Sequence, residues 1–312
     1  MASVDLTSQL ASVLGTEVGE VRRLTGGASR DTYRLSAGGR ALILQRQRPG
    51  ALSRIAVEVA LLRAAHACGV PVAHVVAWSE SSDDLGAPYL IVAAIEGETI
   101  ARRIQRDDAF AAARDGLASQ LGDALARLHT IPVTDVPGLV ADDQLLQYRD
   151  TLDRLGQPHP AFELAMRWLE DNRPAAGSPV VVHGDFRLGN VIVGPEGLRA
   201  VLDWELAHLG DPMEDLGWLC VKAWRFGGRS PVAGVGSYDE LFGAYEARSG
   251  RRVDPAVVRW WEVLGTLKWG VMCIMQASAH LGGMVRSHEL AAIGRRVCEN
   301  EWDLFLALEG VW

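Results

Sequence analysis

The sequence predicts an α+β fold with two lobes, in which a small antiparallel sheet precedes a large, mostly helical part. The chain has 312 residues, 48% hydrophobic and 22% charged, which is the composition of a packed globular protein and not of a disordered chain. Short β-type runs separated by glycine extend to about Ala94, and long amphipathic spacing follows Gly97. No repeat of 20–50 residues occurs, which excludes a solenoid.

The first lobe, residues 1–95, is expected to contain an antiparallel sheet and one helix. Four runs of β-type residues are its predicted strands: 20–24, 31–35, 40–44 and 89–93. Between the third and fourth runs, apolar residues recur at helical spacing over 55–68, and Gly69 ends that helix.

The second lobe, residues 96–312, is expected to be helical with a few short strands. Long amphipathic spacing predicts its helices: 115–129, 161–172 and most of the chain after Pro255. Short β-branched runs predict strands at 180–183, 191–193 and 200–202. Because ligands usually bind in clefts between lobes, we expect the chemistry at this junction.

Composition excludes several other classes of function. The 31 basic and 39 acidic residues give a net charge of −8, and no basic tract is interleaved with aromatics, so we expect no nucleic-acid partner. The four cysteines form no C-x-x-C pair, which argues against structural zinc. The first residues lack a secretory pattern, and the late apolar stretch 269–275 is far below the roughly 20 residues that span a bilayer. We expect a cytoplasmic protein with no membrane partner; the sequence does not indicate its oligomeric state.

The densest group of reactive side chains is the segment HGDFRLGN, residues 183–190, between two apolar runs. In such a loop Asp185 could accept a proton from a hydroxyl, and Asn190 could offer a carbonyl oxygen to a metal. Asp203 ends the next β run and would complete a magnesium site with Asn190. Each residue alone is also typical of a turn or a cap, but all three at strand ends favour a functional site.

These motifs resemble a known family. HGDFRLGN followed by VLDWELAHLGDPMEDLGWL is similar to the aminoglycoside phosphotransferase and choline kinase-like superfamily, relatives of the protein kinases. The likeness runs from LTGGASRDTYRL to WWEVLGTLKWGVMCIMQ and is closest to the subgroup found alone in bacteria or fused to acyl-CoA dehydrogenases. It implies a bilobal protein kinase-like fold and transfer of the γ-phosphoryl group of ATP, or GTP, with Mg²⁺ to a small-molecule hydroxyl.

The resemblance also implies roles for single residues. Asp185 would be the catalytic base, and Asn190 and Asp203 would bind magnesium. Arg187 would steady the transferred phosphoryl group, although a surface ion pair is an equal alternative. Two further residues would support the loop: His183 and Asp215.

The expected nucleotide contacts lie in the first lobe. Gly26, Gly27 and Ser29 stand between two β runs, where a hairpin could cover the phosphates, although a plain hairpin turn would contain the same residues. Glu58 resembles the kinase helix glutamate that pairs with a basic residue. The resemblance places the adenine contacts in the hinge segment LIVAAIEG, at Ala93 and Ile95.

One feature departs from the family pattern, because no lysine occurs before Lys222. Gln45 stands at or beside the place of the usual phosphate-binding lysine, and Arg46 follows it. Side chains alternate across a strand, so both cannot face the nucleotide unless the strand is bulged. We expect Arg46 to supply the charge, because a guanidinium grips phosphate oxygens bidentately.

The acceptor is expected to bind in the helical lobe. Lys268 and Trp269 lie in the tryptophan-rich helix, where core packing is favoured over a place in the acceptor pocket, and Glu205 is a further candidate. A lysine facing the cleft would favour an anionic or acyl-type acceptor over a polycation. The resemblance favours a small metabolite, such as a hydroxyacyl compound, with an aminoglycoside-like compound or a sugar alcohol as other options.

Two other functions stay open from the sequence. The missing lysine is compatible with a pseudokinase that binds nucleotide without transferring phosphate. A hydrolase would instead use Asp185 to activate water and consume ATP without an acceptor.

Overall fold

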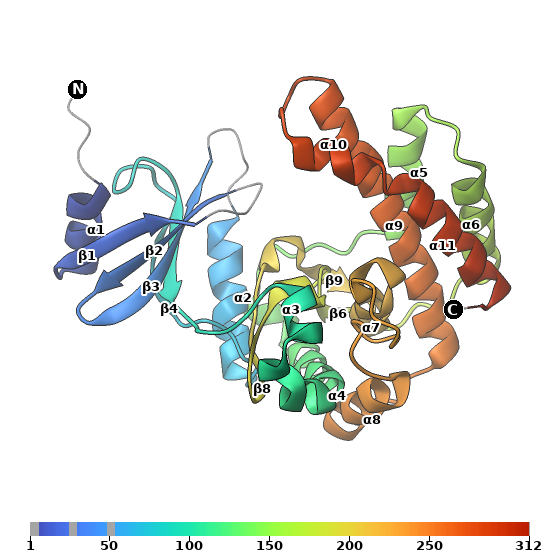
Figure 1. Ribbon diagram of the computed structural model, residues 1–312, viewed down its shortest axis with the longest axis horizontal. Coiled ribbons are helices and arrows are strands. Elements are labelled where there is room, and N and C mark those ends of the chain that lie inside the picture. Colours follow the sequence, from blue (N-terminus) through green and yellow to red (C-terminus); the bar gives the residue numbers. More distant parts are fainter. Residues whose placement is uncertain (1–5, 25–29, 49–53, 312) are drawn as a thin grey trace.

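The computed structural model describes residues 6–24, 30–48 and 54–311 and confirms the α+β fold with two lobes. Figure 1 shows the main sheet near the amino end and most of the helices on the opposite side of the molecule. Among the described helices, none combines the length and the hydropathy that crossing a membrane requires.

The main sheet is antiparallel, with strand order β1-β2-β3-β5-β4. Its strands are β1 (Val18–Arg23), β2 (Arg30–Ala37), β3 (Arg40–Gln47), β4 (Val75–Ser79) and β5 (Tyr89–Ala93). Four of them match the predicted runs, and β4 adds an edge strand that the sequence analysis missed.

Each face of this sheet packs against a different helix. Leu42 and Leu44 of β3 share a core cluster with Leu10 of α1 (Leu6–Leu14), a helix that was not predicted. On the other face, Leu90 of β5 packs in a cluster with Ile55 of α2 (Ile55–Ala67). Because side chains alternate along a strand, this division decides which β3 residues face α2.

The second lobe contains nine of the described α-helices, and all of the predicted helical segments are helical. They are α3 (Ala101–Arg106), α4 (Ala111–Leu128), α5 (Gln144–Leu155), α6 (Pro160–Asp171), α7 (Pro212–Cys220), α8 (Tyr238–Ser249), α9 (Pro255–Leu281), α10 (His288–Gly294) and α11 (Val297–Glu309). Asp254 caps α9 by accepting a hydrogen bond from Ala256 N, and Pro255 occupies the first helical position, where its missing N–H costs nothing.

Two small antiparallel ladders interrupt these helices. β6 (Val180–Val182) pairs with β9 (His208–Gly210), and β7 (Val191–Gly194) pairs with β8 (Gly197–Val201). The β7–β8 hairpin joins the segments that carry two of the predicted site residues, since Leu202 N donates to Asn190 O at 2.8 Å.

The segment that leaves β5 packs on β7. Glu98 exchanges backbone hydrogen bonds of 2.9 and 3.0 Å with Val193. Gly97 has φ +155°, and a Cβ there would lie 2.4 Å from Ile192 Cγ2 and 2.8 Å from Val193 O. Only glycine permits this approach of the two backbones. The domain boundary at 95/96 stays a prediction.

Candidate active site

The predicted catalytic loop lies between β6 and β7, and its central carboxylate is held by three donors. Trp218 Nε1 and Arg187 Nε donate to Asp185 Oδ1 at 2.8 and 3.0 Å. Asn190 Nδ2 donates to Asp185 Oδ2 at 2.6 Å and to its backbone oxygen at 3.0 Å. These bonds fix the direction of the Asp185 carboxylate, which is the precondition for a base that must meet one particular hydroxyl.

His183 links this loop to the end of β8. Its Nε2 lies 2.9 Å from Leu202 O, which can only accept, so Nε2 carries the proton. Its Nδ1 then accepts from Asp185 N at 3.2 Å. Burial lowers the pKa of His183, and a neutral ring satisfies both bonds. Neither ring nitrogen is left for chemistry, so the side chain supports the loop.

Asp215 of α7 is fully buried and holds the loop from below. Its two carboxylate oxygens accept from His183 N at 2.8 Å and from Gly184 N at 2.9 Å. Burial alone would raise the pKa of Asp215, but the hydrogen bond and charge of His129 and the bond from His183 N lower it overall. The carboxylate therefore stays ionised as a brace for two backbone N–H groups.

His129 was not found by sequence reasoning. Its Nε2 lies 3.1 Å from Asp215 Oδ2, and its Nδ1 lies 2.9 Å from the Tyr245 hydroxyl. The residue follows α4, where a histidine near a helix C-terminus is ordinary, so no local pattern marks it. Its role depends on a partner 86 positions away along the chain.

Gly184 turns the loop. Its φ is +76°, and a Cβ there would lie 2.5 Å from Leu206 O. A larger residue would therefore meet both an unfavourable backbone conformation and a backbone oxygen that cannot move away easily.

Asn190 and Asp203 are brought to the same edge by the β7–β8 hairpin. Because Asn190 Nδ2 donates to Asp185, its Oδ1 is the amide atom left for a metal. Asp203 adopts φ +63°, and burial together with the charges of Glu205 and Asp185 raises its pKa to about 6. This concentration of negative charge and hard oxygen donors fits a divalent cation of the magnesium type.

Within the described residues, no group of three or more His, Cys, Asp or Glu side chains could hold a metal by itself. Asn190 and Asp203 would thus need further ligands from a bound phosphate or from water, which is how magnesium usually binds in phosphate-transferring sites.

The basic residue that pairs with Glu58 is Arg30, and this corrects the expected role of Arg46. Arg30 Nη2 lies 2.5 Å from Glu58 Oε2, and its Nη1 donates to Gln45 Oε1 at 2.9 Å. Arg46 follows Gln45 and lies on the other face of the sheet, where it stacks 5.8 Å from the Tyr33 ring and donates to Leu85 O. Strand alternation is the cause, because no bulge interrupts β3 between these residues.

The remaining nucleotide candidates are only partly described. Gly26, Gly27 and Ser29 lie outside the described residues. The Ala93 N–H donates to His74 O at 2.9 Å, so only its carbonyl could meet a base. Half-buried Ile95 follows where β5 ends.

Two of the acceptor candidates lie inside the helical lobe and not on its surface. Lys268 is 6% exposed; its Nζ donates to Gly184 O and Gln144 Oε1, both at 3.2 Å, and lies 3.7 Å from Glu214. Its ammonium group therefore supports the catalytic loop from beneath. Trp269 is 8% exposed and packs 4.8 Å from the Trp224 ring. Both side chains pack in the core, the placement that the sequence favoured, because α9 runs through it.

Glu205, the third acceptor candidate, does not share the position of Lys268 and Trp269 in the core of the helical lobe. It lies in a short 3-10 helix, Trp204–Leu206, and its backbone oxygen accepts from Arg54 Nη1 at 3.4 Å. Its charge acts on Asp203 and on Arg30, which places it toward the sheet lobe.

A cavity of about 720 Å³ opens between α3, α11 and the segment after α7. Its lining carries four basic side chains and two acidic ones: Arg102, Lys222, Arg225, Arg296, Glu299 and Asp303. Phe226 also lines it, and its ring lies 6.4 Å from that of Trp224, over which the Arg187 guanidinium stacks at 4.9 Å. The cavity thus adjoins an aromatic cluster, Trp224 and Phe226, which contacts the Arg187 side chain that binds Asp185.

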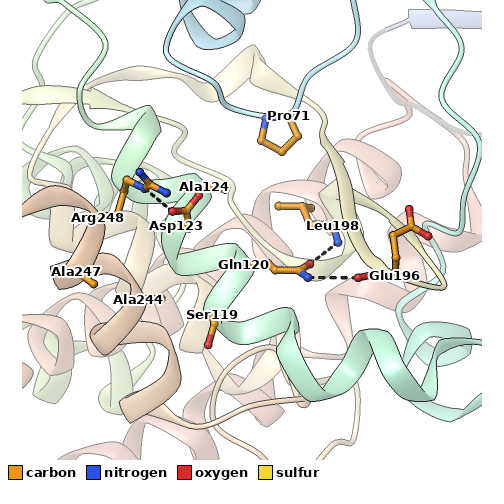
Figure 2. A pocket seen from close by; sticks show the side chains of 10 residues that line it. All are labelled: Pro71, Ser119, Gln120, Asp123, Ala124, Glu196, Leu198, Ala244, Ala247 and Arg248. Atoms are coloured by element: carbon orange, nitrogen blue, oxygen red, sulfur yellow. Dashed lines mark hydrogen bonds and ion pairs between the residues drawn. The ribbon is translucent and has the colours of Figure 1, made fainter.

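A second cavity, about 780 Å³, lies between α4, α8 and β8 and contains none of the predicted site residues (Figure 2). Its polar side chains already pair with one another or with backbone. Gln120 binds Leu198 N and Glu196 O, and Arg248 Nε binds Asp123 at 2.5 Å. The cavity therefore offers no free polar group that would select a ligand.

Comparison with known proteins agrees with this geometry. The model of the family described as "Phosphotransferase enzyme family" matches residues 20–261. Acyl-CoA dehydrogenase family member 10 of Mus musculus is 28% identical over 241 residues, which cover 69% of this chain and 22% of that protein. This chain spans about a third or less of the first acyl-CoA dehydrogenase relatives that it matches.

Solved structures share the fold. A candidate aminoglycoside phosphotransferase of Ralstonia eutropha aligns with a TM-score of 0.76 at 22% identity, over 97% of both chains. Spectinomycin phosphotransferase, solved with ADP and spectinomycin, aligns with a TM-score of 0.70 at 14% identity, over 98% of both chains.

Proposed function

The chain belongs to the phosphotransferase enzyme family, and from this premise we propose that it is a kinase that transfers the γ-phosphoryl group of ATP to a hydroxyl of a small metabolite. The observation that carries the proposal is the Asp185 carboxylate, fixed by Trp218, Arg187 and Asn190 beside the acidic edge formed with Asp203. A positioned base next to a metal-binding edge is the arrangement that phosphoryl transfer needs.

In this proposal Asp185 accepts the proton of the acceptor hydroxyl, and its three donors keep one oxygen lone pair aimed at that hydroxyl. Asn190 and Asp203 would hold Mg²⁺, which neutralises phosphate charge when it is bound. Arg187 Nε is taken by Asp185, and the rest of the guanidinium would steady the phosphoryl group; the side chain is one quarter exposed.

The nucleotide is proposed to bind between residues 1–95, as the nucleotide lobe, and residues 96–312, which carry the catalytic loop. Ala93, through its carbonyl, and Ile95 would contact adenine, and the segment with Gly26, Gly27 and Ser29 would cover the phosphates. The ADP bound in the spectinomycin phosphotransferase structure supports a nucleotide in this fold.

The acceptor is proposed to be anionic, for example a hydroxyacyl compound. The cavity next to the aromatic cluster of Trp224 and Phe226 has four basic against two acidic side chains, so its charge favours an anion and disfavours a polycation such as an aminoglycoside. The acyl-CoA dehydrogenase relatives are compatible with an acyl-type acceptor.

The first test is thermal unfolding with ATP, with and without Mg²⁺, because a ligand that binds only the folded state raises stability. We expect a magnesium-dependent rise in Tm for the wild type and its loss in Asp203→Asn, a substitution that keeps the shape and tolerates the positive φ. Asp239→Asn, an exposed acid in the first turn of α8, is the control and should behave as wild type.

Transfer from labelled ATP to panels of hydroxyacids and aminoglycosides then identifies the acceptor. Labelled product that Asp185→Asn does not form would support the kinase. ATP binding with no product from either panel and no phosphate release would favour a pseudokinase, and phosphate release from ATP alone would favour a hydrolase.

A further inference from the structure

The first lobe must supply a positive charge without lysine, and its arginines differ in what they face. The first lysine in the sequence is Lys222, which lies far beyond the sheet along the chain. Arg23 and Arg48 pair with Asp31, and Arg34 pairs with Glu96. Arg30 is instead 12% exposed and pairs with a glutamate that is 9% exposed.

Arg30 is held by contacts from two elements. Glu58 of α2 forms an ion pair with Nη2 at 2.5 Å, and Gln45 of β3 accepts a hydrogen bond from Nη1 at 2.9 Å. A guanidinium has five N–H donors, so these two contacts do not use all of them. Among the described residues, the buried Nε has no hydrogen-bond partner. The Arg30 guanidinium is thus held in place by two contacts, and it keeps N–H groups that could donate hydrogen bonds to a bound ligand.

The charge of Arg30 also faces the acidic edge of the catalytic lobe. Burial alone would lower the pKa of Arg30, but the ion pair with Glu58 and the charges of Glu205 and Asp203 raise it. The guanidinium therefore stays charged, anchored by Glu58 and acted on by the charge of Asp203, a predicted magnesium ligand. In kinases the nucleotide phosphates lie between such a cation and the metal.

We propose that Arg30 of β2 is the cation that binds the nucleotide phosphates in this chain, with Glu58 as its positioning partner and Gln45 as its neutral neighbour. The positive charge is thereby supplied by β2, and the β3 position next to it carries a glutamine that binds the guanidinium instead of the phosphate. This inference rests on the proposed function, and it removes the main sequence argument for a pseudokinase.

The test compares Arg30→Ala with Arg46→Ala, a matched arginine on the opposite face of the same sheet. Dissociation constants are measured for ATP and ADP and for adenosine, which has no phosphate. We expect Arg30→Ala to weaken ATP and ADP binding about 10-fold or more, the scale of lost charge-assisted hydrogen bonds, with adenosine binding changed less than about twofold. Arg46→Ala should change none of the three by more than about twofold.

Adenosine binding is the readout that separates phosphate recognition from a damaged lobe, since a collapsed sheet would lose all three ligands. The exchange Arg30→Gln with Gln45→Arg returns the charge to β3 and should recover part of the ATP affinity lost in Arg30→Gln.

Three results would overturn the inference. One is unchanged ATP affinity in Arg30→Ala, and another is a larger loss in Arg46→Ala. The third is an equal loss of adenosine and ATP. If the wild type binds ATP through Arg30 but transfers no phosphate, the proposed kinase fails while the assignment of Arg30 stands. If the wild type binds neither ATP nor ADP, both fall.

Discussion

Asp185 takes its orientation from donors in different parts of the chain, and one of them is an indole. Trp218 Nε1 donates to Asp185 Oδ1 at 2.8 Å from within α7, while its ring lies 5.2 Å from the Trp224 ring and carries the Lys268 ammonium group at 4.7 Å. The residue thus combines packing with a direct bond to the predicted base.

Replacing Trp218 with Phe should separate these two roles. We expect kcat to fall about 10-fold, because one donor to the Asp185 carboxylate is lost and the base is less well oriented, with KM for ATP nearly unchanged. Steady-state kinetics of phosphoryl transfer would measure this. Trp168→Phe, which changes an indole on α6 away from the loop, is the control. A KM effect without a kcat effect would contradict the orienting role.

At the scale of elements, α9 supports the predicted catalytic loop through Lys268. Lys268 extends from it to Gly184 O and to Glu214 of α7, so one buried ammonium group joins two helices and the loop. The tryptophan-rich pattern of this helix favoured core packing over an aromatic site, and a helix of 27 residues that is buried along much of its length presents such side chains to the core.

Lys268→Met should destabilise the protein by about 3 kcal/mol or more, because it leaves Glu214 buried with less compensation. The double variant Lys268→Met with Glu214→Gln should recover part of that loss, since the unpaired charge is removed as well. Urea unfolding of the single and double variants measures both effects. Equal stability of wild type and Lys268→Met would refute a structural role for this lysine.

At the scale of the whole molecule, stability should depend on pH through the buried His183. Its folded-state pKa lies below the ordinary value of about 6.5 because the ring is desolvated, so the unfolded chain binds a proton that the folded chain does not. The contribution of His183 is therefore fully present above about pH 6.5 and is lost as the pH falls toward its lower folded-state pKa. Asp203, with its raised pKa of about 6, acts with the opposite sign in the same window.

Comparison with His183→Gln isolates the histidine, because both proteins retain Asp203. The stability difference between wild type and variant should shrink by up to about 1.4 kcal/mol per pH unit below pH 6.5. Urea midpoints at pH 7.5, 6 and 5 measure it. A difference that stays constant over this range would show that His183 titrates equally in the folded and unfolded states.

The sequence by itself determined the α+β class, the order of the two lobes and the loop HGDFRLGN with its following acid. These features are local: strands and helices follow from periodicity, Asp185 and Asp203 follow strands that could be read directly, and Asn190 precedes one. The loop therefore formed where the pattern placed it, and the β7–β8 hairpin brought the segments of Asn190 and Asp203 together.

Only the tertiary structure decided which arginine faces Glu58, that Lys268 and Trp269 are buried, and that His129 braces Asp215. Each of these depends on a partner distant in sequence. The face of Arg46 follows from the alternation of β3 and from which helix covers each side of the sheet, and the burial of Lys268 follows from the packing of α9 against α7. A one-residue difference along a strand reverses the face of a side chain, so residue type and spacing indicated a basic group beside Gln45 but did not identify Arg30 of β2 as the partner of Glu58.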